Sequence, residues 1–120
     1  MRILLVDDDS FLRDMYATKF TEAGHTVEAA ESGDEAVAYL KENTVDVILL
    51  DMVMPRMTGL ELLKQIRDGK LGGTPKCIVL SNQGEETDIK SAADLGVDGY
   101  IVKASMIPSE VVAKVESLHP

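Results

Sequence analysis

The sequence predicts an α/β domain built on a mostly parallel sheet, and three observations support this prediction. Strand and helix patterns alternate along the whole chain, as they do in folds with a parallel sheet. The segments 2–6, 45–50 and 76–80 are almost continuously apolar, which is typical of strands covered on both faces. Each of these segments ends directly on a polar side chain. The length of 120 residues predicts one domain over residues 1–120.

The first two strands are separated by a helix with clear ends. The strand 2–6 leads into a helix that starts at Asp9 or Ser10 and stops at Gly24. The strand 26–30 alternates in polarity, which indicates a position at the edge of the sheet. Apolar residues at helical spacing form the inward face of the helix: Leu12, Met15, Tyr16, Phe20 and Ala23.

Two capping boxes open the second and third helices. Ser32 pairs with Glu35, and Thr58 pairs with Glu61, in the Ser/Thr-x-x-Glu pattern. In this pattern each side chain accepts the backbone N–H of the other residue. The strand 45–50 lies between the two helices. The residues expected to face inward are Ala36, Val37 and Leu40 in the second helix and Leu60, Leu63 and Ile66 in the third.

The last third of the chain continues the alternation. The strand 76–80 precedes a helix at about 85–95 that stops at Gly96, and 99–102 is predicted as the second edge strand. Pro108 lies in the first turn of the last helix, which is a favoured place for proline. The residues expected to face inward are Ile89, Ala92 and Ala93 in the fourth helix and Val111, Val112, Val115 and Leu118 in the fifth.

The order of the strands predicts where the polar strand ends meet. With the second and fifth strands at the edges, right-handed crossovers give the order 2-1-3-4-5. The first and third strands are then neighbours, so Asp7, Asp8 and Asp51 share one crevice. Ser81 and Lys103 follow the fourth and fifth strands at the same edge. Open α/β sheets bind their ligands at this carboxyl edge.

The acidic composition limits the classes of partner. The net charge is −9, and both nucleic acid and anionic membranes require a basic surface, so neither is expected as a partner. A cation or a basic partner is compatible. The single cysteine, Cys77, lies in an apolar segment and is expected to be a buried small hydrophobe. Met1 leads into a strand without a basic or apolar leader, which predicts a cytoplasmic protein.

The three carboxylates predict a metal site. Asp7, Asp8 and Asp51 would repel one another in one crevice, and a hard cation such as Mg²⁺, which prefers oxygen ligands, would relieve the repulsion. Asp9 is expected to cap the following helix instead. Asp51 also suits a nucleophile, because carboxylates accept phosphoryl groups covalently. A role as a metal ligand or loop cap alone is equally compatible with the residues.

Each of the remaining polar strand ends has two interpretations. Lys103 is either a solvated lysine or a partner of Asp51 at rest and of phosphoryl oxygens later. Ser81 either starts a loop or donates its hydroxyl to a phosphoryl oxygen. Tyr100 shares a face of its strand with Val102. It is either a partly buried aromatic at the edge or a side chain that changes rotamer when the loop at Ser81 moves.

The ordered set of these residues resembles the response-regulator receiver domain, the phospho-accepting module of two-component signalling, over the whole chain. Each motif is weak alone, but the set at these separations is highly specific. The matching segments are Val6–Asp8, Asp51 with Met54–Pro55 and Gly59, Ser81, and Tyr100–Lys103. The resemblance implies a flavodoxin-like (βα)5 fold, a three-layer sandwich around a parallel five-stranded sheet in the order 2-1-3-4-5.

The resemblance implies a phosphorylation-dependent signalling switch rather than an enzyme with a substrate of its own. Asp51 would accept a phosphoryl group from a phosphohistidine on a sensor histidine kinase or a phosphotransfer protein. Asp8 and Asp51 would ligate Mg²⁺ directly and Asp7 would help through water. The backbone carbonyl of Val53 would complete the protein ligands.

The same resemblance implies how the signal would leave the site. Lys103 and Ser81 would bind the phosphoryl oxygens. Tyr100 would turn inward as Ser81 is drawn to the phosphate, which would remodel the surface formed by the fourth helix, the fifth strand and the fifth helix. That surface would meet a downstream effector or a second copy of the chain.

Three departures from the family pattern surround the site. The family usually has proline after the lysine, with a cis peptide bond, where this chain has Ala104. The Lys103–Ala104 peptide is therefore expected to be either trans or strained, since a cis bond before a non-proline residue costs about 3–4 kcal/mol. Asn82 replaces a residue that is commonly small. Val53 cannot hydrogen-bond an attacking water, whereas Gln83 can, so the residues leave the lifetime of the acyl phosphate open.

Three other interpretations compete with this one. Asp7 and Asp9 with a downstream serine and lysine also resemble a haloacid-dehalogenase-type phosphatase, although residues 84–86 are a poor substitute for its late acidic pair. A flavin-binding module shares the fold class, but its phosphate loop should be rich in Gly, Ser and Thr rather than triply acidic. A receiver that only binds partners is the third, which the complete set of acids, hydroxyl and lysine disfavours, although Ala104 leaves some room for it.

Overall fold

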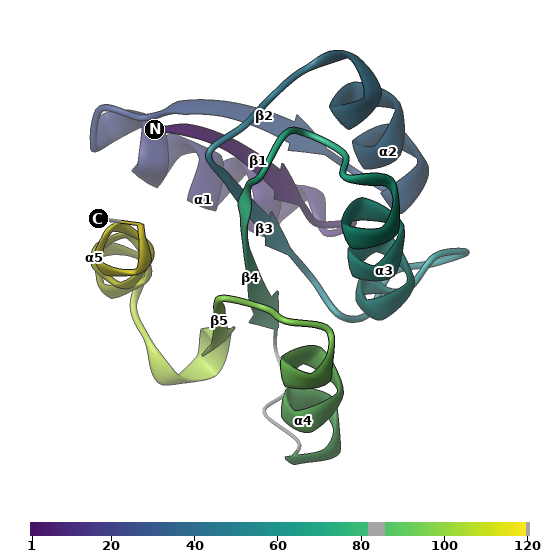
Figure 1. The fold of residues 1–120 in the computed structure, drawn as a ribbon. Helices are drawn as coiled ribbons and strands as arrows, with labels where there is room; N and C mark the ends of the chain where they lie inside the picture. The colour runs from purple at the N-terminus through teal and green to yellow at the C-terminus, as the bar shows by residue number, and fades with distance from the viewer. Residues whose placement is uncertain (82–85, 120) are drawn as a thin grey trace.

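The computed structural model describes the backbone of residues 1–81 and 86–119, with all of their side chains except those of residues 86–88 and 104. Five strands and five α-helices alternate as predicted, and a short 3-10 turn follows the last strand (Figure 1). None of the helices in the described part of the chain is long and apolar enough to cross a membrane. The elements are β1 (Arg2–Val6), α1 (Ser10–Glu22), β2 (Thr26–Ala30), α2 (Gly33–Glu42), β3 (Val47–Leu50), α3 (Gly59–Gly69), β4 (Lys76–Ser81), α4 (Glu86–Asp94), β5 (Gly99–Val102), the 3-10 turn Lys103–Ser105 and α5 (Pro108–Leu118).

The sheet confirms the predicted flavodoxin-like topology. All five strands are parallel, in the order β2-β1-β3-β4-β5. Helices α1 and α5 cover one face, and α2, α3 and α4 cover the other (Figure 1). The register pairs Val6 of β1 with Leu50 of β3, so these two strands end level with each other. The residues that follow them are therefore neighbours at the carboxyl edge.

The core is divided by the sheet into two apolar layers. Alternate residues of each strand point to opposite faces, so Leu4 and Ile48 pack with α2 and α3 while Leu5 and Leu49 pack with α1 and α5. All of these side chains have at most 1% of their surface exposed. Cys77 lies in the first layer, and burial raises the pKa of its thiol to about 11. This supports its interpretation as an unreactive small hydrophobe.

The capping predictions are confirmed at α1 and α3 and half confirmed at α2. Asp9 caps α1 by accepting the N–H of Leu12 at 3.1 Å. Both bonds of the capping box between Thr58 and Glu61 are present at α3. At α2, Ser32 accepts the N–H of Glu35 as predicted. The carboxylate of Glu35 was expected to accept the N–H of Ser32 but accepts that of Glu31 at 2.7 Å instead, because it reaches one residue further back.

The predicted inward face of α4 is partly wrong. Ala92 is fully buried, but Ile89 is 40% exposed and Ala93 is also exposed. Helix α4 has nine residues. Its Ala92 packs in one cluster with Met52 and Val79, and Val97, just beyond the helix, packs against the same cluster. Ile89 and Ala93 lie outside this cluster and are exposed. The predicted start of this helix at residue 85 falls outside the described residues.

Two smaller differences concern the other helices. On α3, Leu62 is fully buried, whereas the predicted Leu60 is only partly buried. Leu60 lies in the first turn and packs against the separate cluster under α4. Ala23 is exposed, because it is the C-cap of α1 and lies beyond the last helical turn that contacts the sheet. The remaining predicted inward residues of α1, α2, α3 and α5 are buried or pack against the core.

The connection after β5 resolves the expectation for the Lys103–Ala104 peptide. Every peptide bond in the described ranges is trans, and this bond is among them. The chain continues from Val102 into the 3-10 turn, which closes with a hydrogen bond from the N–H of Met106 to the carbonyl of Lys103. Of the two expectations from the sequence, a trans peptide bond or a strained cis bond, the structure has the trans bond.

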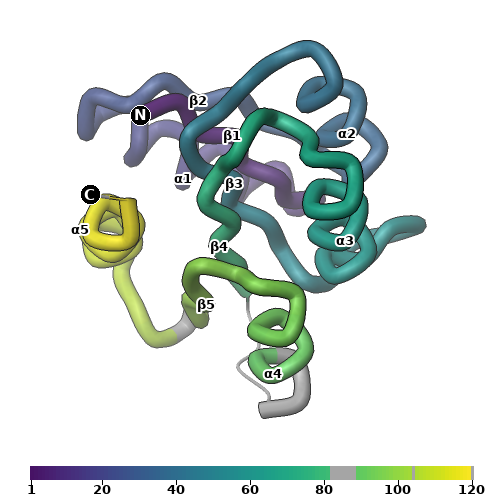
Figure 2. Tube along the Cα trace, viewed as in Figure 1, coloured from purple at the N-terminus to yellow at the C-terminus, as the bar shows by residue number. Residues whose placement is uncertain are grey.

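Gly59 allows α3 to begin directly against the end of β3. The loop between these elements leaves the sheet, projects beyond α3 and returns (Figure 2). On its return the N–H of Gly59 donates to the carbonyl of Met52 at 3.0 Å. A Cβ atom on Gly59 would collide with the backbone carbonyl oxygen of Asp51 and would lie 2.8 Å from Cα of Met52. Only a residue without a side chain fits here.

We expect Gly59→Ala to lower the free energy of unfolding by about 1–3 kcal/mol, because the obstacle is backbone that cannot turn aside. Urea unfolding followed by far-ultraviolet circular dichroism measures this. Gly69→Ala is the matched control in the same helix, because its Cβ would meet the flexible side chain of Leu71 at 3.3 Å. It should be neutral or stabilising by up to about 1 kcal/mol. Equal destabilisation by both substitutions would contradict the close approach at Gly59.

Candidate functional site

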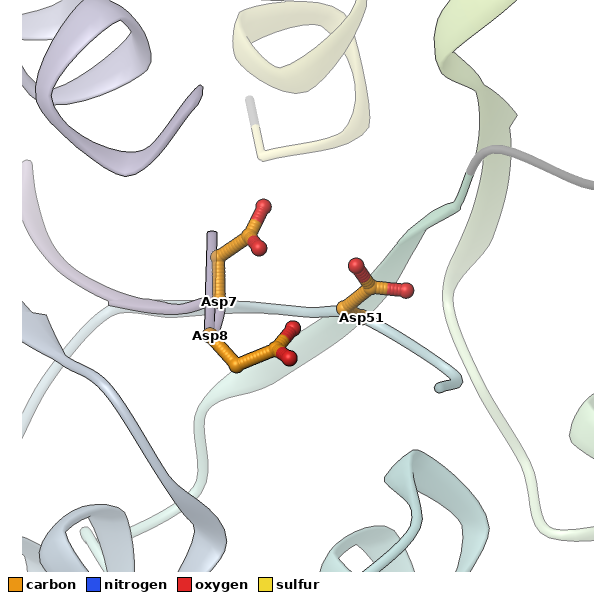
Figure 3. Close-up of side chains that lie close together, drawn as sticks. All are labelled: Asp7, Asp8 and Asp51. Atoms are coloured by element: carbon orange, nitrogen blue, oxygen red, sulfur yellow. The ribbon is translucent and has the colours of Figure 1, made fainter. Parts of the chain in front are cut away.

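Three carboxylates meet at the carboxyl edge of the sheet. Asp7 and Asp8 follow β1, Asp51 follows β3, and one carboxylate oxygen from each lies within 4.8 Å of the others (Figure 3). The side chains of Asp7 and Asp8 both extend toward Asp51 (Figure 3). Asp7 and Asp51 are 1% and 7% exposed, whereas Asp8 faces solvent. The site therefore has two buried acids and one accessible acid.

The sheet itself fixes the two buried acids. The N–H of Asp7 donates to the carbonyl of Ala30 in β2, and the N–H of Asp51 donates to the carbonyl of Val6 in β1, both at 3.1 Å. The ladder of backbone hydrogen bonds thus continues one residue past each strand. The backbone N–H of each acid is therefore held by the neighbouring strand, β2 for Asp7 and β1 for Asp51.

Lys103 bridges the two buried carboxylates. Its Nζ lies 2.7 Å from Oδ2 of Asp7 and 3.3 Å from Oδ2 of Asp51, and its side chain is 5% exposed. Of the two interpretations of this lysine, the solvated one is therefore wrong. Asp51 was the predicted partner, but the shorter contact is to Asp7.

Backbone N–H groups hold the other carboxylate oxygens. Oδ1 of Asp7 accepts the N–H of Asp9 at 3.0 Å, and Oδ1 of Asp51 accepts the N–H of Val53 at 3.2 Å. Both bonds span two residues, so each acid closes a tight turn at the start of its own loop. The contacts of Asp7 are the shorter ones, and Asp51 is the more accessible of the two buried acids.

Burial and charge act in opposite directions on these groups. Burial raises the pKa of Asp51, and the charge of Asp7 adds to this, while Lys103 and the N–H of Val53 lower it. Burial by itself would lower the pKa of Lys103, but its hydrogen bond to Asp7 and the charges of Asp51 and Asp7 outweigh burial and raise it. The raised pKa keeps Lys103 an ammonium at neutral pH, and its charge opposes the effect of burial on Asp51.

The oxygen donors fit a hard divalent cation. Three carboxylates and one ammonium leave two net negative charges when all four groups are ionised. Carboxylate oxygens, with room for water on the exposed side of Asp8, are the ligands that Mg²⁺ prefers, and the cluster has no sulfur or nitrogen ligand for a softer metal. The remaining predicted ligand, Val53, has an exposed side chain, and its N–H is the donor to Asp51.

Ser81 and Tyr100 lie in the two strands on the far side of Asp51. Ser81 is the last residue of β4, is 1% exposed and pairs in register with Val102. Tyr100 is partly buried and packs against the cluster of Met52 and Ala92 under α4. The tyrosine is therefore partly buried at the edge of the sheet, in contact with the layer that carries α4. Asn82, Gln83, Gly84 and Glu85, for which the sequence also raised expectations, lie outside the described residues.

Two residues of α1 approach the site without having been predicted there. The Nη1 of Arg13 donates to the backbone carbonyl of Asp7 at 2.9 Å. Tyr16 is 3% exposed. Burial raises the pKa of its hydroxyl, and the charges of Lys103 and Asp7 act on it in opposite directions. The spacing offered a signal, because helix side chains point toward the N-terminus of the helix. Residues in the first two turns of α1 can therefore reach back to the preceding loop.

Comparison with known proteins identifies the family. Residues 3–116 match the response regulator receiver domain. The transcriptional regulatory protein ResD of Bacillus subtilis is 39% identical over 117 residues, which are 98% of this chain and 47% of that protein. The chemotaxis protein CheY of Halobacterium salinarum is 35% identical over 108 residues, which are 90% of this chain and 88% of that protein. The chain thus spans about half the length of ResD and most of this CheY.

Solved structures agree with these matches. Chemotaxis protein CheY4 of Vibrio cholerae superposes with a TM-score of 0.90 at 28% identity, over 98% of this chain and 97% of that one. Response regulator TrrA of Thermotoga maritima, in complex with Mg²⁺ and BeF, superposes with a TM-score of 0.83 at 34% identity, over 98% and 97% of the two chains. The sheet order, the acidic cluster at its carboxyl edge and the match over nearly the whole sequence lead to one conclusion: this chain belongs to the response regulator receiver domain family.

Proposed function

We propose that this chain is a phosphorylation-dependent switch in which Asp51 accepts a phosphoryl group from a sensor histidine kinase or a phosphotransfer protein. The observation that carries the proposal is the convergence of Asp51 with Asp7, Asp8 and the buried ammonium of Lys103. Membership of the receiver family supports it. The chain would act as one receiver unit over residues 1–120, in the cytoplasm.

Asp51 is better suited than Asp7 to be the nucleophile. It is the more accessible of the two buried acids, and its two contacts are longer, at 3.2 and 3.3 Å against 2.7 and 3.0 Å for Asp7. A carboxylate oxygen of Asp51 would attack phosphorus. The bond from phosphorus to the donor's imidazole nitrogen would break, and the nitrogen would keep the electron pair. This difference also disfavours the phosphatase interpretation, which needs Asp7 as the nucleophile.

The residues present fit a magnesium site. Asp8 and Asp51 would hold Mg²⁺ directly, Asp7 would contribute through water, and the carbonyl of Val53 would complete the protein ligands. Bound there, the ion would supply positive charge that offsets the charge of the phosphoryl oxygens. The complex of the related TrrA with Mg²⁺ and BeF supports this assignment.

Lys103 and Ser81 would convert phosphorylation into a conformational change. The ammonium of Lys103 already lies 3.3 Å from Asp51 and would bind one phosphoryl oxygen, and the hydroxyl of Ser81 would bind another. Moving a two-state equilibrium from mostly off to mostly on requires about 5.5 kcal/mol. Two charge-assisted hydrogen bonds at roughly 1.5–3 kcal/mol each approach this value, and one alone does not.

The change would reach the surface formed by α4, β5 and α5. Tyr100 would turn inward as Ser81 moves. The tyrosine lies in β5, which is paired with the strand that carries Ser81, and it packs in the cluster of Ala92 of α4, so its movement would change the contacts of α4. Two exposed apolar side chains on this surface, Ile89 at 40% and Ile107 at 61%, suit a downstream effector or a second copy of the chain. ResD is a transcriptional regulator about twice as long as the matched region, which supports control of an output function.

Phosphorylation of Asp51 is tested directly by incubation with acetyl phosphate and Mg²⁺ followed by intact-mass measurement. We expect the added mass of one phosphoryl group on the wild-type chain and none on Asp51→Asn or after chelation of the metal. Asp9→Asn is the matched control, because this neighbouring acid caps α1 through the N–H of Leu12, and it should still be modified. An undiminished adduct on Asp51→Asn would show that another residue is the acceptor.

The switch is tested by Ser81→Ala. We expect the adduct to form but the shift toward the active state to fall about tenfold or more, because a hydrogen bond of roughly 1.5–3 kcal/mol is lost. Amide chemical shifts of α4, β5 and α5, with and without acetyl phosphate, measure the shift in population. Ser105→Ala, an exposed serine in the following turn, should switch fully. Complete switching in Ser81→Ala would refute the role of this hydroxyl.

Asp51→Asn should also raise the free energy of unfolding near neutral pH without metal, because it removes a carboxylate whose charged form is disfavoured by burial. Because the pKa of Asp51 is raised in the folded chain, its contribution to stability is complete below its unfolded pKa. It is lost as the pH rises through the folded pKa. Asparagine does not titrate, so the gain should be absent at acid pH, below the pKa of an unfolded aspartate, and should grow as the pH rises above it. Urea unfolding in a chelator measures this difference, with the exposed Asp14→Asn as control. A gain independent of pH would contradict the assignment.

A further inference from the structure

Asp8 is the least supported acid of the site. It faces solvent, and among the described residues no hydrogen bond or ion pair holds its carboxylate. Its oxygen nevertheless lies within 4.8 Å of oxygens of Asp7 and Asp51. A flexible side chain on a flexible backbone would not stay there, because its like-charged neighbours repel it. The backbone on either side of Asp8 must therefore hold it in place.

Both peptide groups that flank Asp8 are held. On one side, the N–H of Asp9 donates to Oδ1 of Asp7 at 3.0 Å, and Lys103 fixes the other oxygen of that carboxylate. On the other side, the carbonyl of Asp7 accepts Nη1 of Arg13 at 2.9 Å. The first contact belongs to the site already described. The second comes from a residue with no other assigned role.

Arg13 reaches this carbonyl because of its place in α1. Its own N–H donates to the carbonyl of the N-cap Asp9 at 2.9 Å, so its Cα lies in the first full turn of the helix. Helix side chains point toward the N-terminus, which directs the guanidinium back over the loop. The residue is half-buried, and arginine remains charged at all relevant pH values.

We propose that Arg13 is a positioning residue for the metal ligand Asp8: by holding the carbonyl of Asp7 it fixes the peptide between Asp7 and Asp8 and so aims the Asp8 carboxylate at the cation. The inference rests on the proposed magnesium site. Residues that orient metal ligands from behind commonly change metal affinity by 10–100-fold when they are replaced.

Because Arg13 is charged, the direction in which its removal changes the metal affinity distinguishes a positioning role from a purely electrostatic one. A guanidinium beside a cation site repels the cation, so a purely electrostatic residue would weaken metal binding and its removal would strengthen it. A positioning residue has the opposite effect, because its removal releases the Asp8 backbone and weakens binding. A residue that braced only the helix would change the unfolding temperature and leave the affinity of the folded protein unchanged.

The experiment is a calorimetric titration of the full chain with Mg²⁺ alone. We expect Arg13→Gln, which loses the charge and is too short to reach the carbonyl, to bind about tenfold more weakly than wild type. Arg13→Lys retains a charged donor and should lose less. Lys19→Gln is the matched control, because it removes one exposed charge from the same helix, and its affinity should stay within about twofold. Unchanged or tighter binding by Arg13→Gln overturns the positioning role.

A second measurement needs no metal. The carbonyl ¹³C resonance of Asp7 reports the hydrogen bond from Arg13, and we expect it to move in Arg13→Gln and to stay in Lys19→Gln. Circular dichroism confirms that each variant is folded before titration. If the wild-type chain shows no saturable Mg²⁺ binding, the magnesium site of the proposed function fails and the positioning role falls with it. If wild type binds and Arg13→Gln binds equally, the positioning role alone fails.

Discussion

A single buried ammonium keeps the acidic edge of this protein together. Lys103 lies within 3.3 Å of one oxygen on each of Asp7 and Asp51, and its charge opposes the burial that raises the pKa of Asp51. Without it, two carboxylates with less than a tenth of their surface exposed would lie side by side with no cation of the described residues bound to them, and burying an uncompensated charge is highly unfavourable. The lysine compensates only part of the charge. The negative charge that remains on the carboxylates is complementary to a divalent cation. The contacts of Lys103 therefore stabilise the site without metal and still leave it able to bind metal.

The sheet explains why these polar groups lie where they do. From Ile3 to Val6 and from Val47 to Leu50 every residue is buried, because helices cover both faces of the central strands. No charged side chain can be accommodated along these segments without a partner, so the first acid appears one residue after each strand ends. The level ends of β1 and β3 then place the acids side by side, and the close approach at Gly59 keeps α3 against the end of β3.

The same geometry supports a short route from the site to the surface. Lys103 follows β5 directly, and Ser81 ends β4, the strand to which β5 is paired. A phosphoryl group bound at this edge, as proposed, would therefore contact the ends of two adjacent strands. On the face of the sheet that α4 covers, Tyr100 contacts the cluster that includes Ala92 of α4. The proposed route to α4 would involve these two strands and one packed aromatic.

The sequence by itself determined the fold and most of the site. Apolar strands, capping residues and polar strand ends are local patterns, and local patterns predicted the strand order, the helix positions and the meeting of Asp7, Asp8 and Asp51. Tertiary structure decided which partner each polar side chain of the site contacts and which residues of a short helix face the core. Lys103 lies closer to Asp7 than to Asp51, α4 exposes Ile89, and Arg13 reaches the carbonyl of Asp7. Each of these outcomes depends on distances of a few ångströms, either between segments far apart in the chain or between residues on either side of a turn. The order and polarity of the residues do not specify such distances.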